Sequence, residues 1–90
     1  MGISHTTVAV TGGATWASAT INNPKSVRVE VVDTVSDVQV DVSFDNGTTV
    51  HDILGPFSSR EMAKTYQNPS SYRIYFRCSS DATVEVTSEK

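Results

Sequence analysis

The stretch RIYFRCSSDATVEV, residues 73–86, decides the fold class of this chain. Apolar and polar side chains alternate on both sides of a Ser-Ser-Asp turn, as is typical of β-strands, in which successive residues point to opposite faces. We predict a hairpin with a three-residue loop and one buried face. The buried face would carry the pairs Cys78 and Ala82, Phe76 and Val84, and Ile74 and Val86. The other face would carry Arg73, Tyr75 and Arg77 opposite Thr87, Glu85 and Thr83, and it suits solvent or a partner.

Two further segments alternate in the same way. The valines of residues 27–32 (VRVEVV) share one face, and so do the apolar residues of 38–44 (VQVDVSF). Both segments are predicted strands with one buried side. An Asp-Asn-Gly sequence follows the second strand and is a strong hairpin signal. A three-residue loop with its glycine in the left-handed conformation pairs Val42 with Val50 and leaves Val40 opposite Asp52. We therefore expect Asp52 near a sheet edge or a β-bulge.

The Gly12-Gly13 pair predicts a second hairpin near the start of the chain. A two-residue loop places Val8 beside Ala17 and turns Trp16 toward the opposite, more polar face. A tryptophan there suits a partner interface, where such residues are enriched. A register shifted by one residue would instead place Trp16 over the core.

The N-terminal part of the chain differs from the rest in charge. All ten acidic residues lie at or after Glu30, and residues 1–26 are rich in Thr, Ala, Ser and Gly. Such a weakly apolar and weakly charged segment is either an edge hairpin of the domain or an arm that completes a sheet with another chain.

The segment after Gly55-Pro56, which we expect to break the chain, has two interpretations. Ser58 and Glu61 fit a capping box, which favours a short helical turn near residues 58–64, with Phe57 and Met62 as its hydrophobic staple. The alternation of residues 61–67 favours a strand instead. Both alternatives remain open from the sequence.

Taken together, the pattern predicts one all-β domain over residues 1–90. Seven to eight short strands separated by turn sequences indicate an antiparallel β-sandwich or a jelly-roll-like domain. The single cysteine excludes an intrachain disulfide. The formal charge of −3 argues against a nucleic-acid or anionic-membrane partner. No apolar run approaches a membrane span or a signal peptide, so we expect a soluble, unexported protein.

The residues that could carry chemistry are few and scattered. The histidines are His5, near the N-terminus, and His51, and neither lies in a catalytic motif. Cys78 falls on the predicted inner face, where a thiol is a small hydrophobe. Zinc-binding spacing is absent, and the period of four among the acids at 33, 37, 41 and 45 does not match a calcium loop. We predict no catalytic, cofactor or metal site, and no enzyme.

Several features from residues 38 to 86 resemble the small virion proteins of tailed bacteriophages. These are VSFDNGTT, the LGPF at 54–57, the Asn-Pro at 68–69 and the closing YRIYFRCSSDATVEV. The resemblance is greatest to capsid decoration, or cement, proteins. It implies an all-β subunit, commonly a homotrimer, that is made in the host cytoplasm and binds the major capsid protein on the exterior of the capsid.

A virion structural protein needs contact residues, and the sequence offers exposed aromatic and arginine candidates. The alternatives are a carbohydrate-binding β-sandwich, in which Trp16, Tyr66 or Tyr75 would stack on sugar rings, and a small tail or baseplate component. The candidate contact residues are Trp16, Phe57, Tyr66, Arg73, Tyr75 and Arg77.

Overall fold

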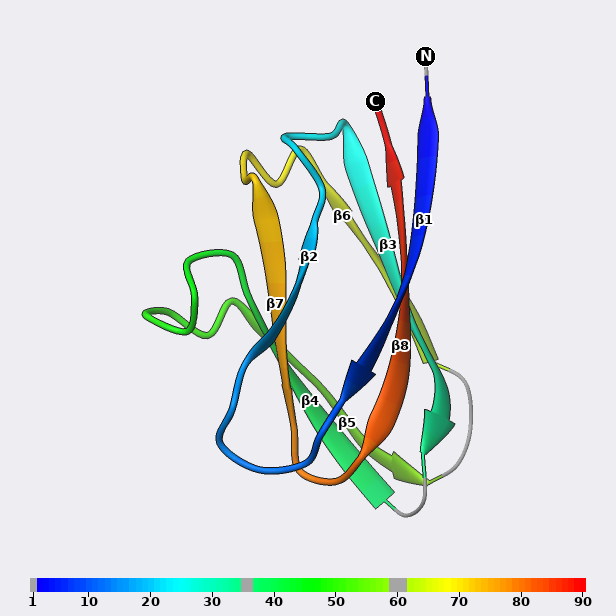
Figure 1. The fold of residues 1–90 in the computed structure, drawn as a ribbon, viewed down its shortest axis with the longest axis vertical. Coiled ribbons are helices and arrows are strands. Elements are labelled where there is room, and N and C mark those ends of the chain that lie inside the picture. Colours follow the sequence, from blue (N-terminus) through cyan, green and yellow to red (C-terminus); the bar gives the residue numbers. More distant parts are fainter. Residues whose placement is uncertain (1, 35–36, 59–61) are drawn as a thin grey trace.

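The computed structural model describes residues 2–34, 37–58 and 62–90. Within these residues the chain forms eight strands and no helix, so no helix there could cross a membrane (Figure 1). The strands are β1 (Ile3–Val10), β2 (Ala17–Thr20), β3 (Ser26–Thr34), β4 (Asp37–Ser43), β5 (Asp52–Ser58), β6 (Met62–Gln67), β7 (Arg73–Cys78) and β8 (Ala82–Glu89).

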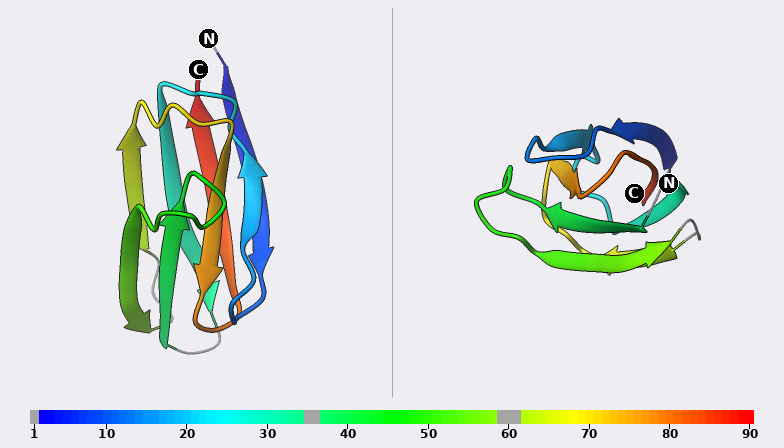
Figure 2. Two further views of the ribbon diagram at one scale, coloured as in Figure 1. Left: turned by 90° about the vertical axis from the view of Figure 1, so that its left-hand side faces the viewer. Right: turned by 90° about the horizontal axis from the view of Figure 1, so that it is seen from below.

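The strands form two antiparallel sheets packed face to face, which confirms the predicted all-β sandwich (Figure 2). Sheet A has the order β1-β8-β3-β6 and sheet B the order β2-β7-β4-β5. The pairs β4–β5, β3–β6, β2–β7 and β1–β8 are nested inside one another, as if one long hairpin had been rolled up. The further pairs β3–β8 and β4–β7 close the roll. This arrangement is a jelly roll.

The core lies between the sheets and consists of the alternate residues of each strand. The six residues predicted to line the inner face of the 73–86 stretch are all buried, as are alternate valines of β3 and β4. Every buried side-chain nitrogen or oxygen in the described part of the chain has a hydrogen-bond partner. The fully buried side chains include Phe76, Ile74, Val27, Val29, Val31, Val38, Val40, Val42, Val84, Val86 and Cys78.

The predicted C-terminal hairpin is wrong, although its buried face is right. β7 lies in sheet B and β8 in sheet A, so the turn at 79–81 crosses from one sheet to the other. The turn is bound to β4 instead: the Ser79 backbone donates to the Gln39 carbonyl, and the Gln39 backbone donates to the Ser79 hydroxyl. Arg73, Tyr75 and Arg77 therefore do not lie beside Thr87, Glu85 and Thr83, which face outward from the other sheet.

The predicted N-terminal hairpin is wrong for the same reason. β1 pairs with β8 and β2 pairs with β7, so the two strands are edges of different sheets. The loop between them is tied to the 79–81 turn, because the Gly12 backbone donates to Asp81 Oδ1 (2.7 Å) and the Gly13 backbone donates to the Cys78 carbonyl (3.0 Å). Two adjacent sheet-to-sheet crossings thus support each other.

The β4–β5 hairpin is confirmed, with a longer loop than predicted. Val42 pairs with Asp52 and Val40 with Leu54, a shift of two residues that keeps Asp52 and Leu54 in their predicted row, but Val50 lies outside the strand and is exposed, and Val38 pairs with Phe57 beyond the bulge. Asp45 organises the loop by accepting the Thr49 N–H at 2.8 Å. As expected, Asp52 lies on an edge strand that contains a bulge.

The bulge falls where a chain break was predicted. Gly55-Pro56 lies inside β5 rather than ending a segment, and Gly55 adopts a positive φ of 87° there. The strand interpretation is confirmed for Met62–Gln67, and Ser58 belongs to β5, so the helical turn near 58–64 is wrong at both of its ends. Residues 59–61, including the capping-box Glu61, lie outside the described residues.

Candidate functional site

The outer face of sheet B gathers four of the six candidate contact residues. Ile74, Phe76 and Cys78 of β7 point into the core, so the intervening side chains point outward. The loop before β2 brings Trp16 over the same side of the sheet. We call this surface the sheet B face; its candidate contact residues are Trp16, Arg73, Tyr75 and Arg77.

Arg77 is the centre of this face. Asp41 lies directly opposite it in the β4–β7 ladder, and Arg77 Nε and Nη2 both donate to Asp41 Oδ2, at 3.0 and 2.8 Å. The guanidinium carbon lies 4.5 Å from the centroid of the Trp16 ring, within the range of a cation–π contact. Trp16 is half-buried by these contacts on the outer surface, so it does not cap the core.

Gly47 lies against the five-membered ring of the Trp16 indole. A Cβ at this position would lie 2.5 Å from Trp16 Nε1, and Gly47 has a positive φ of 84°. The Gly47 backbone donates to the Ser43 hydroxyl, which folds the 44–51 loop over the outer side of β7 (Figure 2). The hairpin loop therefore helps to fix Trp16, a contact between distant segments that no local pattern could indicate.

The sheet B face also includes residues that the sequence analysis missed. Tyr72 is 55% exposed, and the Arg73 guanidinium lies 5.6 Å from its ring centroid. Ile53 is also 55% exposed and pairs with Asp41, which places it on the outer side of edge strand β5. The signal for Ile53 was its position between Asp52 and Leu54. Both were predicted on the inner face, so the apolar Ile53 had to point outward.

Tyr66 lies elsewhere, at the open side of the sandwich between edge strands β5 and β6. Its hydroxyl donates to Asp52 Oδ2 at 2.9 Å, and Lys64 Nζ lies 2.8 Å from the same oxygen. The Lys64 hydrogen bond, with help from Tyr66, holds the pKa of Asp52 below its ordinary value. Burial, followed by the hydrogen bond to Asp52 and then by the Asp52 charge, raises the pKa of Tyr66. Asp52, Lys64 and Tyr66 therefore connect edge strand β5 of sheet B to edge strand β6 of sheet A, which are not paired with each other.

Phe57 belongs to β5, but its side chain lies outside the described residues. The six candidate contact residues therefore do not form one surface. The three aromatics named as sugar-stacking candidates are also divided, because Trp16 and Tyr75 are on the sheet B face whereas Tyr66 points inward from sheet A.

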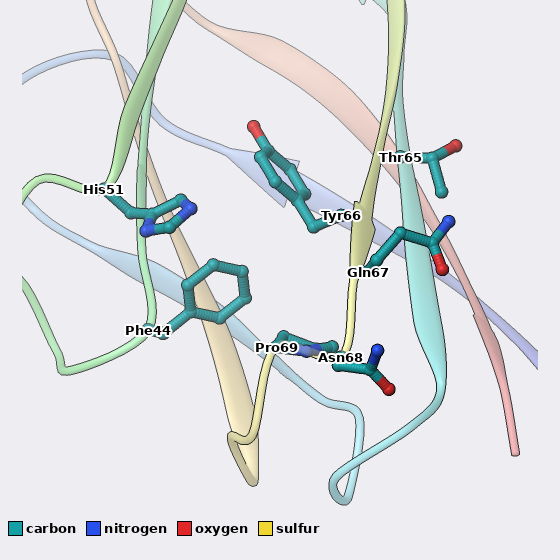
Figure 3. Close-up of a pocket in the computed structure, with 7 residues that line it drawn as sticks. All are labelled: Phe44, His51, Thr65, Tyr66, Gln67, Asn68 and Pro69. Atoms are coloured by element: carbon teal, nitrogen blue, oxygen red, sulfur yellow. The ribbon is translucent and has the colours of Figure 1, made fainter.

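A pocket of about 420 Å³ lies beside Tyr66, between the β4–β5 loop and the end of β6 (Figure 3). The rings of Phe44, His51 and Tyr66 pack edge to face. Their centroids are 5.0 Å apart for Phe44 and His51, 5.8 Å for Phe44 and Tyr66, and 5.6 Å for His51 and Tyr66. Pro69 closes one side, and the chain from Thr65 to Asn68 forms the rim. His51, which lies in no catalytic motif, meets two aromatic neighbours here: Phe44, at the start of the long hairpin loop, and Tyr66, from β6.

Cys78 is buried between the sheets, which raises the pKa of its thiol to about 11. No group of three His, Cys, Asp or Glu side chains among the described residues could hold a metal ion. What the structure offers is a preordered aromatic and arginine surface and a small aromatic pocket.

Comparison with protein-family models, with curated proteins and with solved structures finds no match to this chain.

Proposed function

We propose that this protein is a structural subunit of a bacteriophage virion, a decoration protein that binds the major capsid protein on the outside of the shell through its sheet B face. The resemblance of residues 38–86 to small phage virion proteins supports the proposal. The observation that carries it is the cluster of Trp16, Arg77 and Asp41, with Arg73 and Tyr75 beside it.

The composition of this surface is that of a binding hot spot. Trp, Tyr and Arg are the residues that most often dominate the energy of protein interfaces. Because Arg77 and Gly47 already hold Trp16 in place, a partner could cover the indole without ordering it first. Binding then costs less conformational entropy than it would at a mobile side chain. Arg73 extends the surface and is exposed.

The test is co-sedimentation of the purified protein with shells assembled from the major capsid protein of the same virus without this subunit. We expect the wild-type protein to bind the shells, and Arg73→Ala to weaken binding by about fivefold or more. The matched control is Arg28→Ala, which removes an arginine from the outer face of the opposite sheet. Failure of the wild-type protein to bind the shells, or equal loss in the two variants, would contradict the proposal.

A carbohydrate-binding domain is a second candidate, favoured by the pocket around Phe44, His51 and Tyr66. Its volume of about 420 Å³ is in the range of small-ligand sites, and aromatic rings can pack against sugar rings. Titration with a panel of oligosaccharides tests it. Saturable binding that is lost in His51→Ala and kept in Arg73→Ala would favour this function, and the absence of binding to any glycan would remove it.

A further inference from the structure

The four edges of the two sheets are not alike. In the described residues, β2 is only four residues long, and β5 contains the Gly55-Pro56 bulge. On β6, Lys64 lies in the same inward row as Tyr66, opposite a buried valine of β3. Short edge strands, bulges, prolines and inward-pointing charges are the devices by which proteins prevent an edge from pairing with another chain. Three edges therefore carry recognisable protection.

The fourth edge, β1, carries none of these devices. It is eight residues long, ISHTTVAV, with no proline and no Lys, Arg, Asp or Glu. Its ladder with β8 runs without a register shift from Ile3 to Val10. One side of β1 is paired to β8 and the other side has no strand partner in sheet A. Ile3 is 67% exposed at its start.

β1 itself carries no fixed charge, although its paired strand β8 places Glu85 opposite Thr7 and Glu89 opposite Ile3, with Glu85 Oε1 3.5 Å from His5 Nε2. The first Lys or Arg in the chain is Lys25 and the first acidic residue is Glu30, so β1, β2 and the loop between them contain none. A chain with a net charge of −3 repels a second copy over much of its surface, but two β1 strands can pair without placing fixed like charges directly opposite each other. Of the four edge strands, β1 is therefore the one best suited to pair with the β1 strand of a second copy.

We propose that two copies of this chain pair antiparallel through β1, which joins their A sheets into one continuous eight-stranded sheet across a two-fold axis. The inner faces of both copies stay on the same side of the joined sheet only if each inward-pointing residue of one β1 lies opposite an inward-pointing residue of the other. A register centred on Thr6 satisfies this condition. It also places Ile3 opposite Ala9 and His5 opposite Thr7, which covers the exposed Ile3.

This inference does not rest on the capsid proposal, and it can be tested on the purified protein alone. Light scattering should give twice the chain mass for the wild type. Thr6→Lys places two ammonium groups opposite each other at the axis and should weaken the dimer by about tenfold. The matched control, Ala63→Lys, adds the same charge to the outer face of edge strand β6 and should leave the dimer intact.

A cysteine cross-link checks the register even if Thr6→Lys fails to fold. Thr6→Cys adds one accessible thiol to a chain whose own Cys78 is buried. Two opposed residues of an antiparallel pair lie close enough for a disulfide. Oxidised glutathione should therefore cross-link Thr6→Cys to a covalent dimer, being itself reduced to two thiols, and should leave Ala63→Cys uncross-linked.

Several results would overturn the pairing. A wild-type mass of one chain would mean that β1 is left for a strand of a different protein or for solvent. A mass of three chains, as the resemblance to decoration proteins implied, would also overturn it, because two-fold pairing through one edge closes at two copies. Equal cross-linking of Thr6→Cys and Ala63→Cys would indicate random collision.

Discussion

At Gly12 the backbone of one loop touches the backbone of another. A Cβ on this residue would lie 2.6 Å from Ser80 Cα and 2.9 Å from the Asp81 nitrogen. These are main-chain atoms of the turn that crosses between β7 and β8, and they cannot move as the tip of a side chain can. Glycine is therefore required here by close approach and not by its own backbone angles.

We expect Gly12→Ala to lower the free energy of unfolding by about 1–3 kcal/mol, because the two crossing loops must separate to admit the methyl group. Urea denaturation followed by Trp16 fluorescence measures the change. Gly2→Ala is the control, since a Cβ there would have nothing within 4 Å. Equal stability of the two variants would show that the loops yield freely.

Asp52 gives the protein an acid-sensitive contact. The pKa of Asp52 in the folded protein is below its ordinary value of 3.8. The contact is therefore fully stabilising at a pH above 3.8, and its stabilisation is lost as the pH falls through the lowered pKa of the folded protein. We expect Asp52→Asn to reduce the free energy of unfolding by about 1 kcal/mol at pH 7. The two proteins should become nearly equal in stability once the pH has fallen below the lowered pKa of Asp52.

Denaturation of both proteins across this pH range tests the prediction. Tyr66→Phe removes the hydroxyl hydrogen bond but keeps the Lys64 ion pair, so it should be less destabilising than Asp52→Asn and should keep much of the wild-type pH dependence. A difference between wild type and Asp52→Asn that does not change with pH would mean that the Asp52 charge is not what matters.

At the scale of elements, Trp16 reports how the β1–β2 loop attaches to sheet B. It is the only tryptophan of the chain, and its contacts come from β7 and from the β4–β5 loop. The arginine that touches it is fixed by an aspartate on the neighbouring strand. Arg77 therefore links the β1–β2 loop, through Trp16, to β4, through Asp41.

Arg77→Ala should shift Trp16 emission to longer wavelength and lower the free energy of unfolding by about 1–2 kcal/mol, since it removes a cation–π contact and a charge-assisted hydrogen bond. Fluorescence spectra and denaturation curves measure both effects. Arg73→Ala removes an arginine from the same strand that contacts Tyr72 instead, and its emission should match the wild type. An unchanged spectrum in Arg77→Ala would contradict the described packing.

How much of this site was predictable differs from residue to residue. The outward direction of Arg73, Tyr75 and Arg77 followed from alternation, because a strand has a period of two wherever it lies. The position of Trp16 did not follow, because the loop that carries it crosses between sheets. The pocket was not predictable either, since Phe44 and His51 meet Tyr66 only after both sheets have formed.

For the whole molecule, the nested pairing places the two ends of the chain side by side. Ile3 pairs with Glu89, and the Lys90 backbone donates to the Gly2 carbonyl at 2.9 Å (Figure 1). Only the innermost pair, β4–β5, is local in sequence. The other ladders must close long loops before they gain hydrogen bonds and buried surface.

We therefore expect slow folding for a chain of this size, with refolding in about milliseconds to seconds, as is typical of domains dominated by non-local strand pairs. Stopped-flow dilution from urea, followed by Trp16 fluorescence, measures the rate. Refolding within microseconds would mean that local contacts, and not the nested ladders, limit the process.

The sequence by itself determined which side chains of β4, β7 and β8 face the core, where most strands lie and that the Asp-Asn-Gly loop returns the chain to the neighbouring strand. Only the tertiary structure decided which strands pair. A turn such as 79–81 is compatible with a hairpin in one sheet and with a crossing between two, because the alternation of buried and exposed side chains is the same in both. The choice depends on contacts with distant segments, here Gln39 and Gly13, which complete the backbone hydrogen bonds of Ser79 and Cys78 at the crossing.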